Sequence, residues 1–427
     1  MDLFDKCYKS EVVRLAKHLM KNDIYPYFKT FQSGQDPEVK VDGRQLIMMG
    51  SNNYLGLTSD WRVKASAIRA VQKYGVGCVG SRYLNGTLDI HVKLEDELAD
   101  FVGKEKALLF STGMLTNFGV ISAIAGRHEY IILDEYDHAS IYDGCRLSFA
   151  KVMKFKHNDM SDLERVLKFV GTDKAKLIIV DGVYSMEGDI ANLPGIVSLA
   201  KKYNSRVMVD DAHGIGVMGK GGKGTCDHFG LTDKVDIIMG TFSKSLASIG
   251  GFIAADEDII FYVKHLSRIL IFTASLSPSN VASVRSALKV IKAHPNRIKR
   301  LWKNAEKMRA GFCALGFDIG KSETPIIPIV IGDDEKAFLM CKILYEYGIF
   351  TTPVVSPATP PGRALIRVSI MATHTDEHLD RTLEAFEIAG RELGIIDTNR
   401  PWIKKRKFNY NVFNIRQLRS WMGKIWR

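Results

Sequence analysis

The 427-residue chain lacks the cysteine pairs that would hold a metal ion or carry redox chemistry. No two of its six cysteines form a CxxC motif; they are Cys7, Cys78, Cys145, Cys226, Cys313 and Cys341. This spacing argues against a zinc knuckle and against a redox dithiol. We therefore expect no metal site, and free or buried thiols in a reducing cytoplasm.

A long apolar run and a recognisable targeting segment are also missing. Residues 1–6 contain two aspartates where a signal peptide needs basic residues, and no apolar segment follows them. The uncharged stretch 107–126 holds five Ser, Thr and Asn residues and three glycines, which is too polar for a lone lipid-facing helix. A strand, a turn and a helix are predicted there instead, and the protein is expected to be cytoplasmic.

Acidic residues are absent from the C-terminal end. Residues 400–427 contain nine Lys and Arg and no Asp or Glu, whereas the rest of the chain has 50 basic and 48 acidic residues. Most of the net charge of +11 therefore belongs to a tail, which also holds three of the five tryptophans. Because the body is nearly neutral, we expect no nucleic-acid partner.

Short apolar runs alternate with helical patterns from about residue 90 onward. The seven runs are Ala107–Phe110, Tyr130–Leu133, Val152–Phe155, Leu177–Val180, Val207–Val209, Ile237–Met239 and Phe252–Ala254. Several are followed at once by polar, potentially reactive residues. This pattern predicts an α/β fold with a mostly parallel seven-stranded sheet, whose ligands gather at the carboxyl ends of the strands.

Four parts are expected along the chain. An N-terminal helix and arm would cover 1–50, and a large cofactor-binding domain would cover 51–290. A smaller C-terminal α/β domain would cover 291–395, with strands near 326–331 and 364–369. The basic, aromatic tail would cover 396–427.

The segment Gly75-Val-Gly-Cys-Val-Gly80 matches the letters of a dinucleotide fingerprint. That fingerprint needs a strand before it and a helix after it. Here a helical pattern precedes the glycines and a loop follows, so a nicotinamide site is rejected.

Four other segments bring complementary chemistry to predicted strand ends. Ser111-Thr-Gly-Met114 opens a helix whose backbone N–H groups can bind an anion. Asp210 and Lys244 each follow a strand, and His138 lies in a loop after another. Taken singly, they are more often a turn, a helix cap, a solvated lysine and a loop histidine. Together they supply the anion site, carboxylate, Schiff-base lysine and flat ring that pyridoxal 5'-phosphate requires.

The chain resembles the α-oxoamine synthase family, which are pyridoxal-phosphate enzymes of fold type I. The resemblance covers about residues 25–395, and its strings are Gly50–Leu57, Gly80–Thr87, Asp137–Ser140, Gly182–Asp189, Val209–Gly214 and Gly240–Ser245. It implies a homodimeric acyltransferase. Three further features, His91, Lys156–Asp159 and Ser356–Pro360, are most similar to bacterial members that condense L-serine with a palmitoyl thioester. These imply 3-oxosphinganine as product, the first step of sphingolipid synthesis.

The resemblance also implies roles for single residues. Lys244 would form the imine with the cofactor and later move the substrate α-proton. Asp210 would bond the pyridine nitrogen, His213 the ring 3-oxygen, and His138 would stack on the ring. The remaining implied cofactor contacts are Thr112, Gly113, Met114, Ser185, Thr241, Ser243 and Thr273, the last from the neighbouring subunit. The implied substrate contacts are Asn52, Ser81 and Arg367.

Several alternatives stay open. The amino acid could be glycine, alanine or cysteate, and the acyl donor a coenzyme A or a carrier-protein thioester. A catalytically silent subunit is disfavoured by the intact set of Lys244, Asp210, His138 and His213. Some relatives carry an arginine where Val355 stands, which leaves Arg367 as the expected guanidinium for the substrate carboxylate.

The tail has two interpretations. It could be a solvated extension. Alternatively, Lys404–Lys407 and a basic helix over 412–427 with Leu418, Trp421 and Ile425 on one face could lie on a membrane surface or dock an acyl carrier protein.

Overall fold

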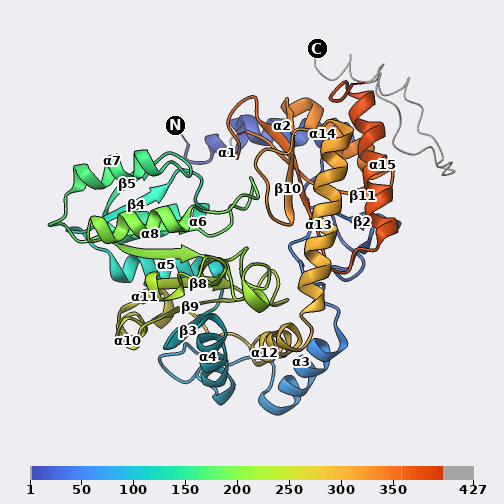
Figure 1. Ribbon diagram of the computed structural model, residues 1–427. Helices are drawn as coiled ribbons and strands as arrows, with labels where there is room; N and C mark the ends of the chain where they lie inside the picture. Colours follow the sequence, from blue (N-terminus) through green and yellow to red (C-terminus); the bar gives the residue numbers. More distant parts are fainter. Residues whose placement is uncertain (1, 357, 398–427) are drawn as a thin grey trace.

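The computed structural model describes residues 2–356 and 358–397 (Figure 1). The predicted tail helix and basic cluster lie outside these residues. No helix in the described part of the chain combines the length and the apolar character needed to cross a membrane. Within the same residues, no group of three or more His, Cys, Asp or Glu side chains is placed to hold a metal ion.

A seven-stranded sheet forms the centre of the large domain. Its strand order is β3-β9-β8-β7-β6-β4-β5, and β9 alone runs antiparallel to its neighbours. The strands are β3 (Lys106–Phe110), β4 (Tyr130–Asp134), β5 (Lys151–Phe155), β6 (Lys176–Asp181), β7 (Arg206–Asp210), β8 (Ile237–Thr241) and β9 (Gly251–Ala255). Each predicted run agrees with a strand to within two residues, so the mostly parallel α/β sheet is confirmed.

Helices cover both faces of this sheet because successive strand residues point to opposite sides. Ile131 and Leu133 of β4 pack into a core with one set of helices, whereas Ile132 packs into the core on the other face. The helices of the first face are α5 (Gly113–Ile124), α6 (Ala139–Ser148), α10 (Glu257–Leu266) and α11 (Arg268–Ile271). The opposite face carries α4 (Asp89–Val102), α7 (Met160–Val170), α8 (Leu193–Lys202) and α12 (Pro278–Ala293).

A smaller antiparallel sheet, β10-β13-β12, lies beside the large domain (Figure 1). Its strands are β10 (Ile326–Gly332), β12 (Pro353–Val354) and β13 (Ala364–Ser369). The long helices α13 (Asn296–Leu315), α14 (Asp334–Glu346) and α15 (Asp376–Glu392) pack on it. Strands were predicted at β10 and β13, and both are present.

The N-terminal arm joins this smaller unit. After α1 (Asp5–Lys9) and α2 (Glu11–Lys21), β1 (Glu38–Val41) and β2 (Arg44–Met48) form a third sheet with β11 (Ile349–Phe350). β11 pairs parallel to β2, and Ser369 N–H donates to the Met49 carbonyl over 2.7 Å. The arm thereby carries residues 51–56 to the edge of β13.

The glycine segment 75–80, which was rejected as a dinucleotide site, begins where a helix ends. α3 (Trp61–Tyr74) stops at Gly75, whose φ of 81° suits glycine, and a loop follows. The remaining elements are short: η1 (Lys220–Gly222), α9 (Thr225–His228) and η2 (Thr232–Lys234).

Candidate active site

A cavity of 330 Å³ opens at the carboxyl ends of the parallel strands. Nine of the residues predicted for the site line it: Thr112, Gly113, Met114, His138, Asp210, His213, Thr241, Ser243 and Lys244. Asn117, Ser140 and Asp181, which the sequence interpretation did not single out, line it as well.

One end of the cavity is suited to an anion. Helix α5 begins at Gly113 directly after β3, and the hydroxyl of its N-cap Thr112 accepts a hydrogen bond from Leu115 N–H. Thr241 Oγ1 and Ser243 Oγ lie 3.0 Å apart across from this helix start. A Cβ at Gly113 would come within 2.7 Å of Thr241 Oγ1, so a side chain there would fill the cradle. Backbone N–H groups and two hydroxyls are the donors that a phosphate needs.

A buried carboxylate faces the cavity at the end of β7. Asp210 Oδ2 accepts from Asn117 Nδ2 over 2.7 Å, and Oδ1 accepts from Ala212 N–H over 3.0 Å. Asn117 also donates to Ser140 Oγ, which fixes the orientation of its amide. Donors on both oxygens hold Asp210 in the geometry needed to bind a protonated ring nitrogen.

Lys244, the lysine predicted to bind the cofactor, follows β8. Burial lowers its pKa to about 8, with a smaller contribution from Arg367, although Asp210 and Asp181 oppose the shift. A substantial fraction of the amine is therefore neutral near neutral pH. Neutral amine is the form that attacks a carbonyl and accepts a proton.

A chain of polar contacts joins the cofactor residues to the predicted substrate residues. His213 Nδ1 lies 2.8 Å from the Tyr54 hydroxyl. That hydroxyl lies 3.4 Å from Asn52 Oδ1 and 3.5 Å from Arg367 Nη2. Burial, followed by the charges of Lys244 and Arg367, lowers the pKa of His213 well below its ordinary value, so this ring is neutral. Tyr54 thus links the predicted cofactor residues to the predicted substrate residues.

Arg367 on β13 is held by the connection between β6 and α8, residues 182–192, which we call the Ser185 loop. Its Nε donates to the Ser185 carbonyl oxygen, and its Nη1 donates to Ser369 Oγ over 2.6 Å. Ser185, predicted as a cofactor contact, lies against Arg367 and is not among the residues lining the cavity. Val355, where some relatives carry arginine, packs against apolar residues.

Four more predicted residues are not among those lining the cavity: Asn52 and Arg367, which contact Tyr54, and Ser81 and Thr273. Ser81 is buried and pairs through its backbone with Ala274 in an isolated bridge. Thr273, the neighbour of the exposed Phe272, is half-buried and lines a different, smaller hollow. Its reach into the site of a neighbouring subunit stays a prediction.

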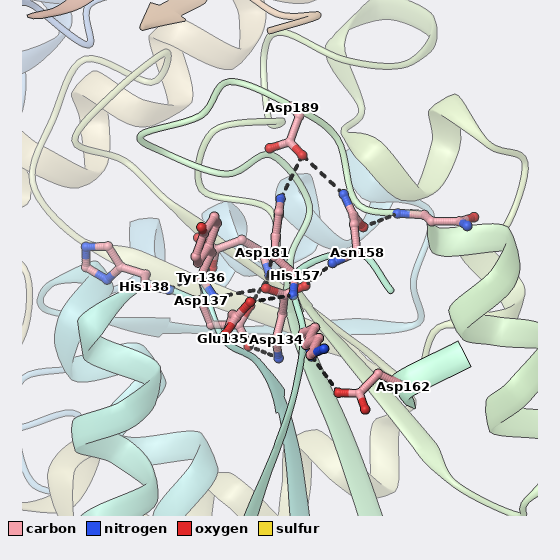
Figure 2. A network of polar contacts seen from close by, with 12 residues as sticks. Asp134, Glu135, Tyr136, Asp137, His138, His157, Asn158, Asp162, Asp181 and Asp189 are labelled. Carbon is pink, nitrogen blue, oxygen red and sulfur yellow. Dashed lines mark hydrogen bonds and ion pairs between the residues drawn. The ribbon is translucent and has the colours of Figure 1, made fainter. Parts of the chain in front are cut away.

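Buried carboxyl groups gather near His138, and Asp181 among them lines the cavity (Figure 2). Asp181 follows β6, and its Oδ1 accepts from His138 N–H over 3.4 Å. Burial, and next the charge of Asp210, raises the pKa of Asp181 well above its ordinary value. Asp137 accepts from the backbone N–H groups of both Asp134 and Asp181, and burial again raises its pKa. Burial therefore opposes negative charge on both of these acids.

The residues present fit pyridoxal phosphate. The anion cradle, the carboxylate of Asp210, the amine of Lys244 and the ring of His138 converge on one cavity. Asn117 and Asp181 line the same cavity, and Tyr54 contacts its lining residue His213. No sequence pattern pointed to Asn117, because its hydrogen-bond partner Asp210 lies 93 residues away along the chain. Asp181 could have been found by its position at a strand end. Tyr54 lies in the family string Gly50–Leu57, but the sequence interpretation gave it no role in the site.

Comparison with known proteins agrees with this geometry. A family profile described as "Aminotransferase class I and II" matches residues 44–386. Serine palmitoyltransferase of Bacteroides ovatus is 53% identical over 382 residues, covering 90% of this chain and 97% of that protein. The 8-amino-7-oxononanoate synthase of Thermoanaerobacter pseudethanolicus is 43% identical over 381 residues, covering 89% of this chain and 96% of that protein.

Solved structures give the same picture. A serine palmitoyltransferase from S. paucimobilis with a bound PLP–myriocin aldimine superposes with a TM-score of 0.90 at 38% identity, covering 93% of this chain and all of that one. The Sphingomonas wittichii serine palmitoyltransferase has a TM-score of 0.90 at 37% identity, with the same coverage.

Proposed function

The chain belongs to the class I and II aminotransferase family, in the group of the bacterial serine palmitoyltransferases, and on that premise we propose its reaction. It is a pyridoxal-phosphate-dependent acyltransferase. It joins L-serine to the acyl group of a long-chain thioester, releases the thiol and carbon dioxide, and yields 3-oxosphinganine. Lys244 and Asp210 converge on one cavity, and Arg367 lies close enough for its charge to lower the pKa of Lys244; this arrangement carries the proposal.

The cofactor would be held at three points. The start of α5, with Thr241 and Ser243, would bind the phosphate, Asp210 the ring nitrogen, and Lys244 the aldehyde carbon. When bound, pyridoxal phosphate supplies an electron sink that stabilises negative charge at the substrate Cα. Asn117 keeps Asp210 in place for this, and His138 offers a flat ring at the cavity wall.

The protein's own groups orient the substrate and move its proton. Arg367 can grip the serine carboxylate with two parallel hydrogen bonds, which fixes the bond at Cα that faces the ring. Lys244, with its pKa near 8, takes the α-proton and later returns one to the product. Neutral His213 would share a hydrogen bond with the Tyr54 hydroxyl at Nδ1 and bind the cofactor oxygen through its other ring nitrogen.

The choice of substrate is tested by product analysis. The holoenzyme is incubated with L-serine, glycine, L-alanine or cysteate and with acyl thioesters of increasing chain length, as coenzyme A and as carrier-protein derivatives. Mass spectrometry should find 3-oxosphinganine from L-serine and a palmitoyl thioester as the dominant product. Preferred use of alanine with a shorter thioester would favour the reaction type of the similar 8-amino-7-oxononanoate synthases.

We also propose a homodimer in which Thr273 contacts the phosphate of the neighbouring subunit's cofactor. The position of Thr273 outside its own cavity supports this. The exposed apolar residues nearby would then be covered; they are Val76, Val79, Leu84 and Phe272. Mixing a Lys244→Ala chain with a Thr273 variant should restore part of the activity. No restoration despite proven subunit exchange would contradict shared sites.

For the tail, outside the described residues, we propose contact with an anionic membrane surface. Its nine basic residues and three tryptophans support this. The full chain should sediment with anionic vesicles at low salt, and a variant ending at Asp397 should not. Equal sedimentation would refute the membrane contact. A loss of activity confined to carrier-protein thioesters would instead assign the tail to docking that protein.

A further inference from the structure

The string Lys156-His-Asn-Asp159 has no role in the reaction as described so far, yet it lies close to the active site. His157 follows β5. Its ring lies between the end of β4, which carries Asp134, and the Ser185 loop, which carries Asp189 (Figure 2). Nδ1 lies 2.9 Å from Asp134 Oδ1, and Nε2 lies 2.8 Å from Asp189 Oδ2. Tyr136 stacks on one side of the ring at 4.4 Å, and Tyr184 packs edge-on at the same distance.

This arrangement requires an imidazolium. A neutral imidazole carries one N–H, so one of its nitrogens would turn a lone pair toward a carboxylate. With both nitrogens protonated, each donates a charge-assisted hydrogen bond. Burial alone would lower the pKa of His157, but the bonds to Asp134 and Asp189 outweigh it and raise the pKa to about 9.

One of the two carboxylates belongs to the rigid sheet. Asp134, the last residue of β4, is fully buried and also accepts from the backbone N–H groups of Tyr136 and Asn158. Its position is therefore set by the sheet and by the turn after β5.

The other carboxylate belongs to the Ser185 loop. Asp189 accepts from His157 and from Asn158 Nδ2, and its own carbonyl accepts from Tyr184 N–H. Val183 and Ile190 pair across the base of the loop. His157 thus ties the loop to the sheet at Asp189, four residues beyond Ser185.

The same loop makes polar contacts with β13 and with the residues just before β13 and β10. The Ser185 carbonyl accepts from Arg367 Nε, and Glu187 pairs with Arg363. The Gly188 carbonyl accepts from Thr324 N–H and from its hydroxyl. A Cβ at Gly188 would come within 2.1 Å of the Ile326 carbonyl oxygen, so the loop and the smaller sheet are in direct backbone contact.

We propose that His157 is a positioning residue for substrate binding: as an imidazolium between Asp134 and Asp189, it holds the Ser185 loop, and through the Ser185 carbonyl it sets the position of Arg367. The inference rests on the proposed function only in taking Arg367 as the group that grips the amino-acid carboxylate. Loss of the positive charge leaves Asp134 and Asp189 facing each other across a neutral ring, which loosens the loop and the arginine together.

The other charged or titratable groups around the ring do not replace it. They are Glu135, Tyr136, Asp159, Tyr184, Lys321 and Glu323. Glu135 accepts from the backbone N–H of His157 and adds negative charge. No hydrogen bond or ion pair joins Lys321 to Asp134 or Asp189 in the described part of the chain.

The test is a double-mutant cycle on the holoenzyme, read by the change in cofactor absorbance on titration with L-serine. His157→Gln should raise the Kd for L-serine about tenfold and leave the Kd for pyridoxal phosphate unchanged. In an Arg367→Lys background, which lacks the Nε donor to Ser185, the same change should raise it less than twofold. His378→Gln is the matched control. His378, on α15, also pairs with a carboxylate, that of Glu38, but no hydrogen bond or ion pair among the described residues joins it to the Ser185 loop.

Equal effects of His157→Gln in both backgrounds, or no effect beside an intact Arg367, would overturn the proposal. If L-serine gives no absorbance change with the unaltered enzyme, the proposed substrate is wrong. The cycle is then run with the amino acid that does respond, because the inference concerns the carboxylate alone.

A second variant keeps the test decisive if His157→Gln folds poorly. In Asp189→Asn, a neutral His157 can donate to Asp134 and accept from the new amide, so the loop is held without the charge. Since the folded-state pKa of His157 lies above its ordinary value, the clamp of the unaltered enzyme is intact below pH 9 and is lost above it. The ratio of Kd values, unaltered over Asp189→Asn, should rise about fivefold from pH 8 to 10. Using this ratio cancels the titration of the serine amine. A flat ratio would refute the clamp.

Discussion

The cofactor residues and the substrate residues of the active site, its cofactor half and its substrate half, are assembled in different ways. Asp210, Lys244 and the start of α5 follow strands of one sheet, so the backbone hydrogen bonds of that sheet fix their spacing. The substrate half, by contrast, is made of Tyr54 from the N-terminal arm, the Ser185 loop and Arg367 from β13. Side-chain hydrogen bonds and ion pairs hold these pieces together. The sheet therefore positions the residues that bind the cofactor, whereas the residues that bind the substrate are positioned by polar contacts between distant segments.

The largest expected effect lies in the cofactor half. Lys244→Ala should abolish turnover and the borohydride-reducible link to the cofactor. Loss of proton transfer alone costs about 10²–10⁴-fold in rate. Lys234→Ala, at an exposed lysine, is the control. Both are measured by product formation and by the visible absorbance of the purified protein. Residual turnover with normal absorbance would show that another lysine carries the cofactor.

Arg367→Ala should break the substrate half alone. Losing a bidentate charged pair should weaken L-serine binding by about 2–5 kcal/mol, while the affinity for pyridoxal phosphate stays the same. Parallel titrations with serine and with cofactor separate the two halves. A comparable loss in both would show that the halves are not independent.

Asn117→Leu tests whether the support of Asp210 matters as much as Asp210 itself. The change leaves a buried carboxylate oxygen without its donor, which should weaken cofactor binding by about 1–3 kcal/mol. Ser122→Ala on the same helix is the control, because Ser122 bonds only to its own helix backbone. The apoenzyme is titrated with pyridoxal phosphate. Equal affinities in the two variants would contradict this role for Asn117.

The smallest expected effect is a pH dependence of cofactor uptake. Because the pKa of Lys244 is lowered to about 8, the free amine grows about fivefold from pH 7 to 8 and levels off above about pH 9. The rate at which the apoenzyme takes up pyridoxal phosphate should follow this curve in stopped-flow absorbance. Asp181 raises the pKa of Lys244, so in Asp181→Asn the curve should move to lower pH. An unshifted curve would mean that Asp181 stays uncharged throughout.

The same division explains what could be predicted from the sequence. The strands and the cofactor residues were predictable, because a local apolar run followed by a reactive residue places that residue at the sheet edge. Arg367 and Asn52 were predicted through family resemblance alone. The contacts of Tyr54, Asn117 and His157 were not predicted, because each depends on a partner brought close by the fold. The contact of Ser185 with the cofactor stays a prediction, and the bond from Arg367 to the Ser185 carbonyl oxygen was not predicted.

The pairing of β2 with β11 affects the order in which parts of the protein fold during synthesis. The strands of the large sheet are complete once residue 255 has been made, and domains generally fold as units while the chain emerges. β1 and β2 can pair with each other early, but β2 must wait for β11, and Tyr54 must wait for Arg367, 313 residues further along the chain. Contacts this far apart carry a high loop-closure cost and form late. A nascent chain would therefore assemble its cofactor cavity well before it could hold an amino acid.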